Sequence, residues 1–286
     1  VTVEDNIPPV ASCHDLTLQL DAGGAVILTP AQLDAGSSDA CGLSFAFGDD
    51  LPSVIEFGCG EVGVQSIPLV VTDANGNSSS CVSNITIEDN VDPVALCQDV
   101  TVELNALGSA ILTPAQIDDE SNDACGIDAL SLDITSFTCA DVGTQIVTLT
   151  VEDEHGNTST CTATVTVEDN TAPSLDCQDI TVQLDNDGLV SITPAQIVGT
   201  PSEGCDLAST TLDISAFDCA DVGQNTVVVT AEDENGNAST CTAIVTVEDN
   251  IAPVASCQDL PLQLDAGGAV ILTPAQLDAG SSDACG

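Results

Sequence analysis

The chain has 286 residues, of which 46 are acidic, two are histidine and none is lysine or arginine, so its formal charge is −46 at neutral pH. Nucleic acid is excluded as a partner, because no cationic side chain is present to neutralise phosphate. No apolar run approaches the roughly 20 residues of a membrane-spanning helix. Because 43% of the residues are hydrophobic and many alternate with polar ones, we expect packed domains and not the disorder that the charge alone suggests.

An acidic segment recurs along the chain and divides it into repeats. It reads Glu-Asp-Asn, two further residues and a proline, and a cysteine lies four residues after each proline. These cysteines are Cys13, Cys97, Cys177 and Cys257, spaced by 84, 80 and 80 residues. A period of this size indicates an array of small domains. We predict the end of one repeat at 1–6, full repeats at 7–90, 91–170 and 171–250, and the start of another at 251–286.

A longer repeat is superimposed on the first. Residues 1–42 and 245–286 are identical at 39 of 42 positions, a closer match than neighbouring repeats show. The duplicated unit is therefore predicted to be a cassette of three repeats, and the chain a window from a longer protein. Secretion signals and anchors would then lie outside this window.

Hydrophobic and polar residues alternate along short segments of the second repeat, as in strands with one dry and one wet face. In chain order the pattern predicts strands at 100–104, 110–113 and 130–134, a turn at 140–143, a strand at 147–151, a turn at 155–156 and a last strand at 161–167. The acidic loop 118–123 separates the second strand from the third. Evenly spaced short strands without helical periodicity predict an all-β fold, in which each repeat of about 80 residues is a small Ig-like β-sandwich.

The first repeat departs from this pattern in two places. Four extra residues lengthen a loop at 47–52, and Pro68 stands inside the penultimate strand, where repeat two has Thr148. Proline cannot donate a hydrogen bond to a neighbouring strand, so we expect the edge of the strand at Pro68 to be unpaired.

Cysteines occur in sets of four at matching places in the repeats. They are widely spread and contain no Cys-x2-Cys pair, which favours structural disulfides over a zinc site and indicates an oxidising compartment. The sets are Cys13, Cys41, Cys59 and Cys81; Cys97, Cys125, Cys139 and Cys161; and Cys177, Cys205, Cys219 and Cys241, with Cys257 and Cys285 in the incomplete repeat.

Two signatures in the repeats resemble the hyalin-repeat (HYR) family. One is a proline followed by Cys-Gln-Asp and an apolar strand, and the other runs from an Asp-x-x-Gly-Asn turn to a cysteine, at 73–81, 153–161 and 233–241. Similar four-cysteine modules occur in large secreted adhesins and surface fibre proteins of Bacteroidota-type bacteria. The resemblance implies an Ig-like fold, an extracellular or cell-surface location and a fibre or adhesive role. The family's usual Cys-Pro is Cys-His or Cys-Gln here, so no particular ligand follows.

Strand order suggests how the cysteines pair, although four cysteines allow three connectivities. Cys97 starts the first strand and Cys161 starts the last, and these elements can lie side by side in Ig-like sandwiches. We therefore expect the disulfides Cys13–Cys81, Cys97–Cys161 and Cys177–Cys241. The others pair by elimination as Cys41–Cys59, Cys125–Cys139 and Cys205–Cys219.

The acidic connectors are predicted to bind calcium, since the chain has no lysine or arginine to offset their charge. Alternating strand directions bring the hairpin between the last two strands to the end of the repeat where the preceding connector enters. Carboxylate and amide oxygens from several short segments suit Ca²⁺, which takes six to eight such ligands. The connectors also resemble those of cadherins. The alternative is that Asn-Gly forms a type I′ turn and the acids only solvate the surface.

The expected calcium ligands form three groups, one for each connector and the hairpin that it approaches. They are Glu4, Asp5 and Asn6 with Asp73, Asn75 and Asn77; Glu88, Asp89 and Asn90 with Asp153, Glu154 and Asn157; and Glu168, Asp169 and Asn170 with Asp233, Glu234 and Asn237. The acid two residues before the second cysteine of each repeat is a further candidate, namely Asp39, Asp123, Glu203 or Asp283. A bond from that cysteine to the third would draw its loop away from the junction.

No catalytic site is predicted. His14 and His155 occupy unrelated places and are absent from the sister repeats, which indicates surface histidines. A nearly unchanged cassette suits length more than recognition, so we expect a non-enzymatic extracellular fibre, stalk or filament. Its partners would be other repeats of the same protein, with self-association into filaments. The alternative is an adhesin that binds carbohydrate or protein through its repeats, although a chain with five phenylalanines and no tryptophan or tyrosine offers few stacking surfaces.

Overall fold

The computed structural model describes residues 2–48 and 51–286. Val1, in the predicted end of a preceding repeat, and residues 49–50, in the longer loop expected for the first repeat, lie outside the described residues. The chain forms two compact units, which run through the second repeat, so the repeat boundaries remain predictions. The first unit holds Val1–Thr101, Leu112–Thr135 and Thr144–Thr166, and the second holds Val102–Ile111, Ser136–Gly143 and Val167–Gly286.

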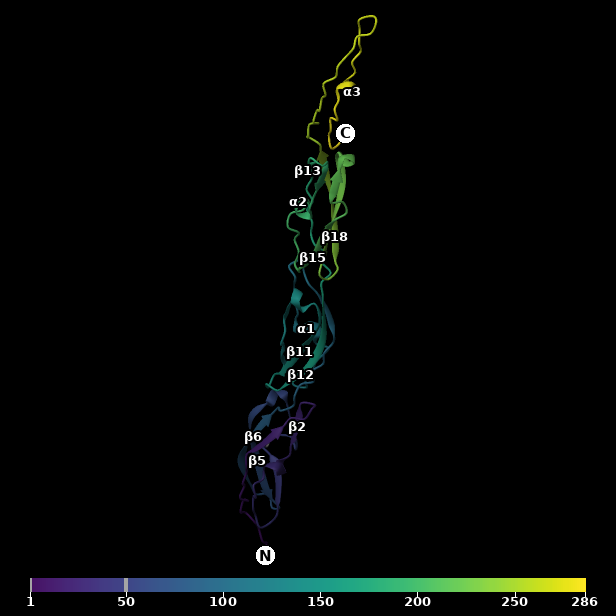
Figure 1. The fold of residues 1–286 in the computed structure, drawn as a ribbon. Helices are drawn as coiled ribbons and strands as arrows, with labels where there is room; N and C mark the ends of the chain where they lie inside the picture. Colours follow the sequence, from purple (N-terminus) through teal and green to yellow (C-terminus); the bar gives the residue numbers. More distant parts are fainter. Residues whose placement is uncertain (1, 49–50) are drawn as a thin grey trace. The chain divides into compact units, whose positions relative to one another are not determined.

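Strands make up most of the regular structure of both units (Figure 1), which confirms the predicted all-β class. The first repeat contains β1 (Leu16–Gln19), β2 (Ala25–Leu28), β3 (Leu43–Phe47), β4 (Ile55–Gly58), β5 (Gly63–Asp73) and β6 (Ser78–Glu88), with 3-10 turns η1 (Pro30–Leu33) and η2 (Cys59–Glu61). The second contains β7 (Val100–Glu103), β8 (Ser109–Ile111), β9 (Ile127–Leu132), β10 (Ser136–Thr138), β11 (Gly143–Asp153) and β12 (Thr158–Glu168), with α1 (Pro114–Ile117) and η3 (Cys139–Asp141). The third contains β13 (Ile180–Gln183), β14 (Leu189–Ser191), β15 (Leu207–Leu212), β16 (Ala216–Asp218), β17 (Gly223–Asp233) and β18 (Ala238–Glu248), with α2 (Pro194–Ile197) and η4 (Cys219–Asp221), and α3 (Pro274–Leu277) follows.

The first and third repeats share one sandwich topology. In the first, a four-stranded sheet has the order β1-β6-β5-β3, and β2 pairs with β4 in a second, two-stranded sheet. Strands β5 and β6 form a long antiparallel hairpin, while β1 runs parallel to β6 with Leu16 opposite Ile85. The third repeat has the same arrangement, β13-β18-β17-β15 with β14-β16. The first strand therefore lies beside the last, as in the predicted Ig-like sandwich.

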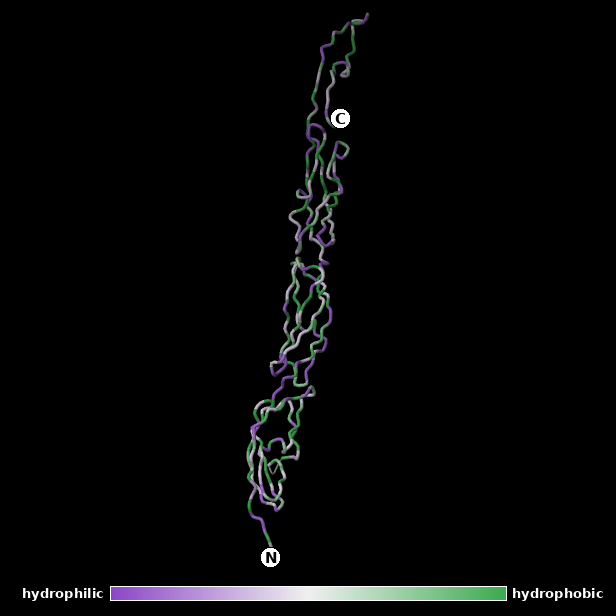
Figure 2. The backbone as a smooth tube through the Cα atoms, turned by 60° about the horizontal axis from the view of Figure 1, so that its bottom comes forward, coloured by the Kyte–Doolittle hydropathy of each residue, from purple (hydrophilic) through white to green (hydrophobic). Residues whose placement is uncertain are grey.

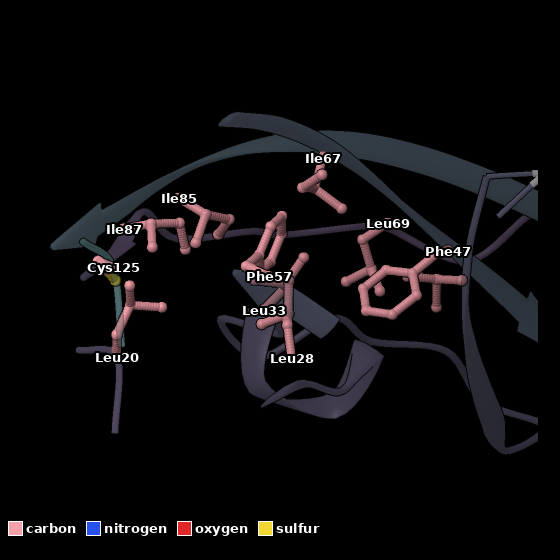
Figure 3. Packing of buried hydrophobic residues seen from close by; sticks show 11 residues of the cluster. Leu20, Leu28, Leu33, Phe47, Phe57, Ile67, Leu69, Ile85, Ile87 and Cys125 are labelled. Atoms are coloured by element: carbon pink, nitrogen blue, oxygen red, sulfur yellow. The ribbon is translucent and has the colours of Figure 1, made fainter. Parts of the chain in front are cut away.

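The core lies between the two sheets and is made of aliphatic side chains with few aromatics. In the first unit, Leu28, Leu69 and Ile85 are fully buried, because β5 and β6 turn every second residue inward. Figure 3 shows Cys125, a residue of the second repeat, at one end of this cluster beside Leu20 and Ile87. The second repeat thus adds a side chain to the core of the first.

Hydrophobic and hydrophilic stretches are interspersed along the whole chain (Figure 2), as expected for many short amphipathic strands. Each helical segment among the described residues has only three or four residues. None of these helices is long and apolar enough to cross a bilayer.

Pro68 fits inside β5 because its nitrogen faces the place where β3 has ended. The last β3 pair is Phe47 with Leu69, and the next residue, Gly48, donates its N–H to the Pro68 carbonyl at 3.2 Å. In an antiparallel ladder the N–H and C=O of one residue point to the same neighbour. The missing donor therefore lies beyond the last paired residue of β3, so this edge is unpaired as expected.

Three disulfides have the predicted pairing within a repeat. They are Cys13–Cys81, Cys97–Cys161 and Cys177–Cys241, with Cα atoms 5.8 to 5.9 Å apart and sequence separations of 68, 64 and 64 residues. Each bond joins the segment before the first strand of a repeat to the last strand. The parallel pairing of these two strands brings the cysteines together.

The other three disulfides differ from the prediction, because each joins the third cysteine of one repeat to the second cysteine of the next. They are Cys59–Cys125, Cys139–Cys205 and Cys219–Cys285, all 66 residues apart. The expected pairs Cys41–Cys59, Cys125–Cys139 and Cys205–Cys219 are wrong. Cys41 and Cys257 are unpaired and exposed.

Strand direction explains why the second and third cysteines of one repeat do not meet. Cys41 precedes β3, whose Leu43 pairs with Asp73 at the end of β5, whereas Cys59 precedes Gly63 at the start of β5. The 11 residues of β5 span roughly 35 Å at about 3.4 Å each. A disulfide needs Cα atoms within about 7 Å, so Cys59 bonds across the junction instead.

A glycine in the turn after the first strand leaves room for each of these bonds. A Cβ at Gly24 would lie 2.8 Å from the Cys59 sulfur and 3.2 Å from the Ala124 Cβ, and the equivalent Gly108 and Gly188 are as crowded. Gly268 has the same local sequence, and a Cβ there would meet nothing within 4 Å.

We predict that Gly24→Ala hinders formation of the Cys59–Cys125 bond, whereas Gly268→Ala leaves every disulfide intact. Both glycines have positive φ, 74° and 78°, so the strain on the turn is the same and only the crowding differs. Peptide mapping without reduction measures the outcome. Equal amounts of the Cys59–Cys125 peptide in the two variants would contradict the prediction.

Candidate metal centres

A hairpin turn with the same hydrogen bonds closes the last two strands of each repeat. In the first repeat, Oδ1 of Asp73 accepts from the backbone N–H groups of Asn75 and Asn77, both at 2.8 Å, and Oδ2 accepts from the Asn77 amide at 2.8 Å. Asp153 and Asp233 make the same bonds in the other two turns. These hydrogen bonds fix the orientation of a buried carboxylate at the tip of each hairpin.

Each hairpin contacts the connector that enters its repeat, as predicted. The side-chain amide of Asn77 donates to the Asp5 carbonyl at 3.1 Å, Asn157 donates to the Asp89 carbonyl at 3.1 Å, and Asn237 donates to the Asp169 carbonyl at 2.9 Å. In the first repeat the Ser79 hydroxyl also donates to the Pro9 carbonyl at 2.6 Å. Two points of the connector are therefore held by one hairpin.

A third acidic segment completes the cluster at each junction. Carboxylate oxygens lie within 4.8 Å of one another in the groups Asp89, Asp123 and Asp153, and Asp169, Glu203 and Asp233. At the first junction the corresponding group is Asp5, Asp39 and Cys41. The acid before the second cysteine thus belongs to the cluster. Its cysteine bonds to the preceding repeat, which keeps this loop at the junction.

Several residues expected in the clusters lie elsewhere. The Glu88 carboxylate accepts from Gln19 at 2.7 Å and from Asn90 at 3.4 Å, and Glu168 accepts from Asn170 at 3.2 Å. These side chains lie beside the first strand of the repeat that they leave. The remaining expected ligands outside the carboxylate clusters are exposed, namely Glu4, Asn6, Asn75, Glu154 and Glu234.

Extended backbone explains this difference, because successive residues of a strand point to opposite sides. In each Glu-Asp-Asn connector only the aspartate is directed to the hairpin, and its neighbours are directed away. Asp89 and Asp169 are 6% and 7% exposed, and the hairpin residues Asp153 and Asp233 are each 1% exposed.

His155 is a residue at the second junction that the sequence reading placed on the surface. Its Nδ1 lies 3.1 Å from Oδ2 of Asp89, and its side chain is 19% exposed. At the third junction the equivalent residue, Asn235, donates to Oδ2 of Asp169 at 2.9 Å. Alignment of His155 with Asn235 was the signal that could have identified it as a partner of the connector.

Burial and hydrogen bonding act in opposite directions on the hairpin aspartates. For Asp153 and Asp233 burial acts to raise the pKa, but hydrogen bonds from Asn157 or Asn237 and from the turn backbone hold the pKa below its ordinary value of 3.8. At Asp73 the bond from the Asn77 side chain is the main cause of a lowered pKa. These carboxylates are therefore ionised at neutral pH.

Acid should destabilise the hairpins even without a metal. A carboxyl whose pKa is lowered by folding contributes stability that is present above the unfolded pKa, near 3.8, and is lost as the pH falls through the lower folded pKa. We expect urea unfolding in EDTA to show a drop in stability below about pH 4. Asp153→Asn should reduce this drop, and an unchanged pH profile in that variant would contradict the assignment.

The clusters at the second and third junctions have the donor chemistry of a calcium site. Their ligands are hard oxygens from three short segments, and Ca²⁺ is bound by six to eight such oxygens. Oδ2 of Asp89 and Oε2 of Glu203 are buried without a hydrogen-bond partner, so each has a free lone pair for a cation. Cys125 and Cys205 are disulfide-bonded and offer no thiolate. The carboxylates therefore fit Ca²⁺ better than a thiophilic metal.

Comparisons with known proteins give one relative by sequence and several by structure, and no family model matches the chain. Sidekick-1 immunoglobulin domains 1–5 have 11% sequence identity and a TM-score of 0.40, covering 85% of this chain and 60% of that one. Mouse cadherin-23 EC22–24 has 15% identity and a TM-score of 0.33, covering 85% of this chain and 99% of that one.

Hyalin of Strongylocentrotus purpuratus is 28% identical over a 283-residue alignment that covers 90% of this chain and 22% of hyalin. The chain thus spans about a fifth of the length of this relative. The alignment runs through all of the predicted full repeats and agrees with the two signatures that resemble the hyalin repeat. The chain is therefore similar to hyalin in sequence, and its repeats are hyalin-repeat-like domains of Ig type.

Proposed function

We propose that the chain is part of a non-enzymatic extracellular protein whose repeats build a long fibre, stalk or filament at a cell surface. The observation that carries the proposal is the set of disulfides between repeats, such as Cys59–Cys125 and Cys139–Cys205. Each junction then has two covalent connections, the connector and a disulfide. Two connections restrict rotation and bending far more than one short linker does, and stiffness is what a fibre requires.

An extracellular location is supported by the disulfides, because such bonds persist in oxidising compartments. Six disulfides join 12 of the 14 cysteines. The relative reported above is a sea-urchin protein, so the bacterial surface implied by the family resemblance stays a prediction. Self-association into filaments is likewise part of the proposal.

Calcium at the junctions is the second part of the proposal. Asp89, Asp123 and Asp153 would hold one ion, and Asp169, Glu203 and Asp233 would hold another. Bound Ca²⁺ would neutralise buried carboxylates that have no lysine or arginine to pair with. It would also join the connector, the hairpin and the loop of the second cysteine, which come from three separate segments of the chain.

Direct adhesion to sugars through the repeats has less support. Four of the five phenylalanines, Phe47, Phe57, Phe137 and Phe217, are at most 4% exposed and lie in the cores. The chain has no tryptophan or tyrosine. Aromatic faces on which a sugar could stack are therefore scarce.

Electron microscopy of the native protein tests the fibre. We expect long, uniformly thin particles whose bending stiffness falls when the disulfides are reduced under conditions that leave the sheets folded. Flexible beads of equal stiffness before and after reduction would exclude a rigid fibre. A stalk that ends in a globular head would assign adhesion to another part of the protein.

A further inference from the structure

We propose that the disulfides within the repeats remove the folded body of each repeat from the path of mechanical tension. This inference rests on the proposed fibre function, because a fibre or stalk must bear load. It adds a property that stiffness alone does not give: the chain would be nearly inextensible even when its sheets rupture.

The covalent path through a repeat is short. Tension that enters through the connector reaches Cys13 and can cross directly to Cys81, whose Cα lies 5.9 Å away. It then follows the last strand and the next connector to Cys97, and crosses to Cys161 over 5.8 Å. Residues 14–80 and 98–160 form closed loops beside this path. Unfolding these loops cannot lengthen the chain while the disulfides remain.

The limit on extension follows from the number of residues on the path. The stretch from Cys81 to Cys97 has 16 residues, which span at most about 50–60 Å when fully extended. Without the disulfides, a repeat of 80 residues could reach roughly 260–290 Å. Half of the 16-residue stretch is already in the extended strand β6, which ends at Glu88. Little additional length is therefore available.

The load-bearing part of β6 is also held from both sides. Residues Ile85 to Glu88 pair with β1 on one edge and with β5 on the other. The backbone N–H of Asn84 donates to the Asp15 carboxylate at 2.8 Å, and the N–H of Leu20 donates to the Glu88 carbonyl at 3.0 Å. These contacts anchor the closed loop to the strand that carries the load.

The disulfides between repeats lie on a longer path and do not bear the same load. The route from Cys81 back to Cys59, across to Cys125 and back to Cys97 contains 22 and 28 residues, against 16 for the direct route. It stays slack while the direct route is taut. The two kinds of disulfide thus have separate roles: those within repeats limit extension, and those between repeats limit rotation and bending.

Single-molecule force spectroscopy of the oxidised chain, held at its two ends, tests this inference. We expect no extension step longer than about 60 Å per repeat. In the variant Cys13→Ser/Cys81→Ser, the shortest route from residue 13 to residue 97 passes through Cys59–Cys125 and has 74 residues in place of 16. The contour length at full stretch should then increase by roughly 190–210 Å.

The variant Cys59→Ser/Cys125→Ser is the matched control, since it removes a loop of nearly the same size, 66 against 68 residues. It should leave the contour length unchanged. Total contour length at full stretch does not depend on folding, so a variant that fails to fold still gives a result. Steps of 200 Å or more in the oxidised chain, or equal lengthening in both variants, would overturn the load path. Neither outcome bears on whether microscopy shows stiff fibres, so the proposed function is tested separately.

Discussion

Removal of calcium is expected to lower the melting temperature of the protein by roughly 10–20 °C. Extracellular calcium modules have dissociation constants on the order of 10⁻⁴ M or weaker. An ion at about 100 times its dissociation constant stabilises the folded state by about 2.7 kcal/mol, and a domain of this size gains about 4–8 °C per kcal/mol. Scanning calorimetry in 10 mM Ca²⁺ and in EDTA at equal ionic strength measures the difference. Sodium in place of calcium should not restore the higher value.

A single substitution in the acidic loop makes this test specific. Asp123→Asn keeps the side-chain oxygen that accepts from the Cys125 N–H at 2.7 Å but removes one charge from the cluster. Without calcium it should raise the melting temperature, because it relieves repulsion among Asp89, Asp123 and Asp153. With calcium it should lower the melting temperature, because one ligand charge is lost.

The control for this substitution lies four residues earlier in the same loop. Asp119 is exposed and lies outside the clusters, so Asp119→Asn removes the same charge without touching the site. It should not change the stabilisation by calcium. Indistinguishable responses of the two variants to calcium would mean that the acids act only as a charged, solvated surface.

Local patterns were sufficient to predict the strands. The alternation at 147–151 and 161–167 lies within β11 and β12, because a half-buried strand shows its two faces in the sequence. The same rule, applied to the connectors, would have corrected the predicted ligands. Ile87 and Asp89 are buried and Glu88 between them is not, so only one residue of Glu-Asp-Asn can face the hairpin.

The pairing of the second and third cysteines could not be obtained by elimination within one repeat. Elimination assumes that each repeat is closed on itself, but Cys41 and Cys59 both precede strands that run antiparallel to each other, β3 and β5. Cysteines placed in this way lie at opposite ends of a sandwich. The information needed was the sheet order, which depends on contacts between distant residues. Crowded glycines such as Gly24 and Gly108 were the local trace of those contacts.

The variant Cys59→Ser/Cys125→Ser is expected to weaken both the stability of the first junction between full repeats and its affinity for calcium. Closing a loop of 66 residues stabilises the folded state by up to about 4 kcal/mol in the chain-entropy model. The bond also holds the segment that carries Asp123, two residues before Cys125. Ordering that segment costs about 1–2 kcal/mol for each residue fixed, so the loss of the bond should reduce calcium affinity roughly tenfold.

Other contacts of the same loop set the size of this effect. Asn122 exchanges backbone hydrogen bonds with Val94 at 2.8 and 3.0 Å, and the Ser121 hydroxyl accepts from the Leu96 N–H at 3.0 Å. These bonds hold the loop on the body of the second repeat. The disulfide in addition fixes it to the first repeat, where Cys125 is part of the core cluster. The variant should therefore lose affinity and not the whole site.

The matched control is Cys219→Ser/Cys285→Ser, which removes a bond with the same 66-residue separation. No hairpin follows Asp249 and Asp283 in this chain, so this bond supports no complete cluster. Calcium titration calorimetry should then show one weakened site in the first variant and unchanged sites in the control. If the Asp89 cluster keeps its affinity without Cys59–Cys125, the disulfide acts on the junction only as a tether. In that case the calcium site is organised by the connector and the hairpin, through Asn157 and Asp153 alone.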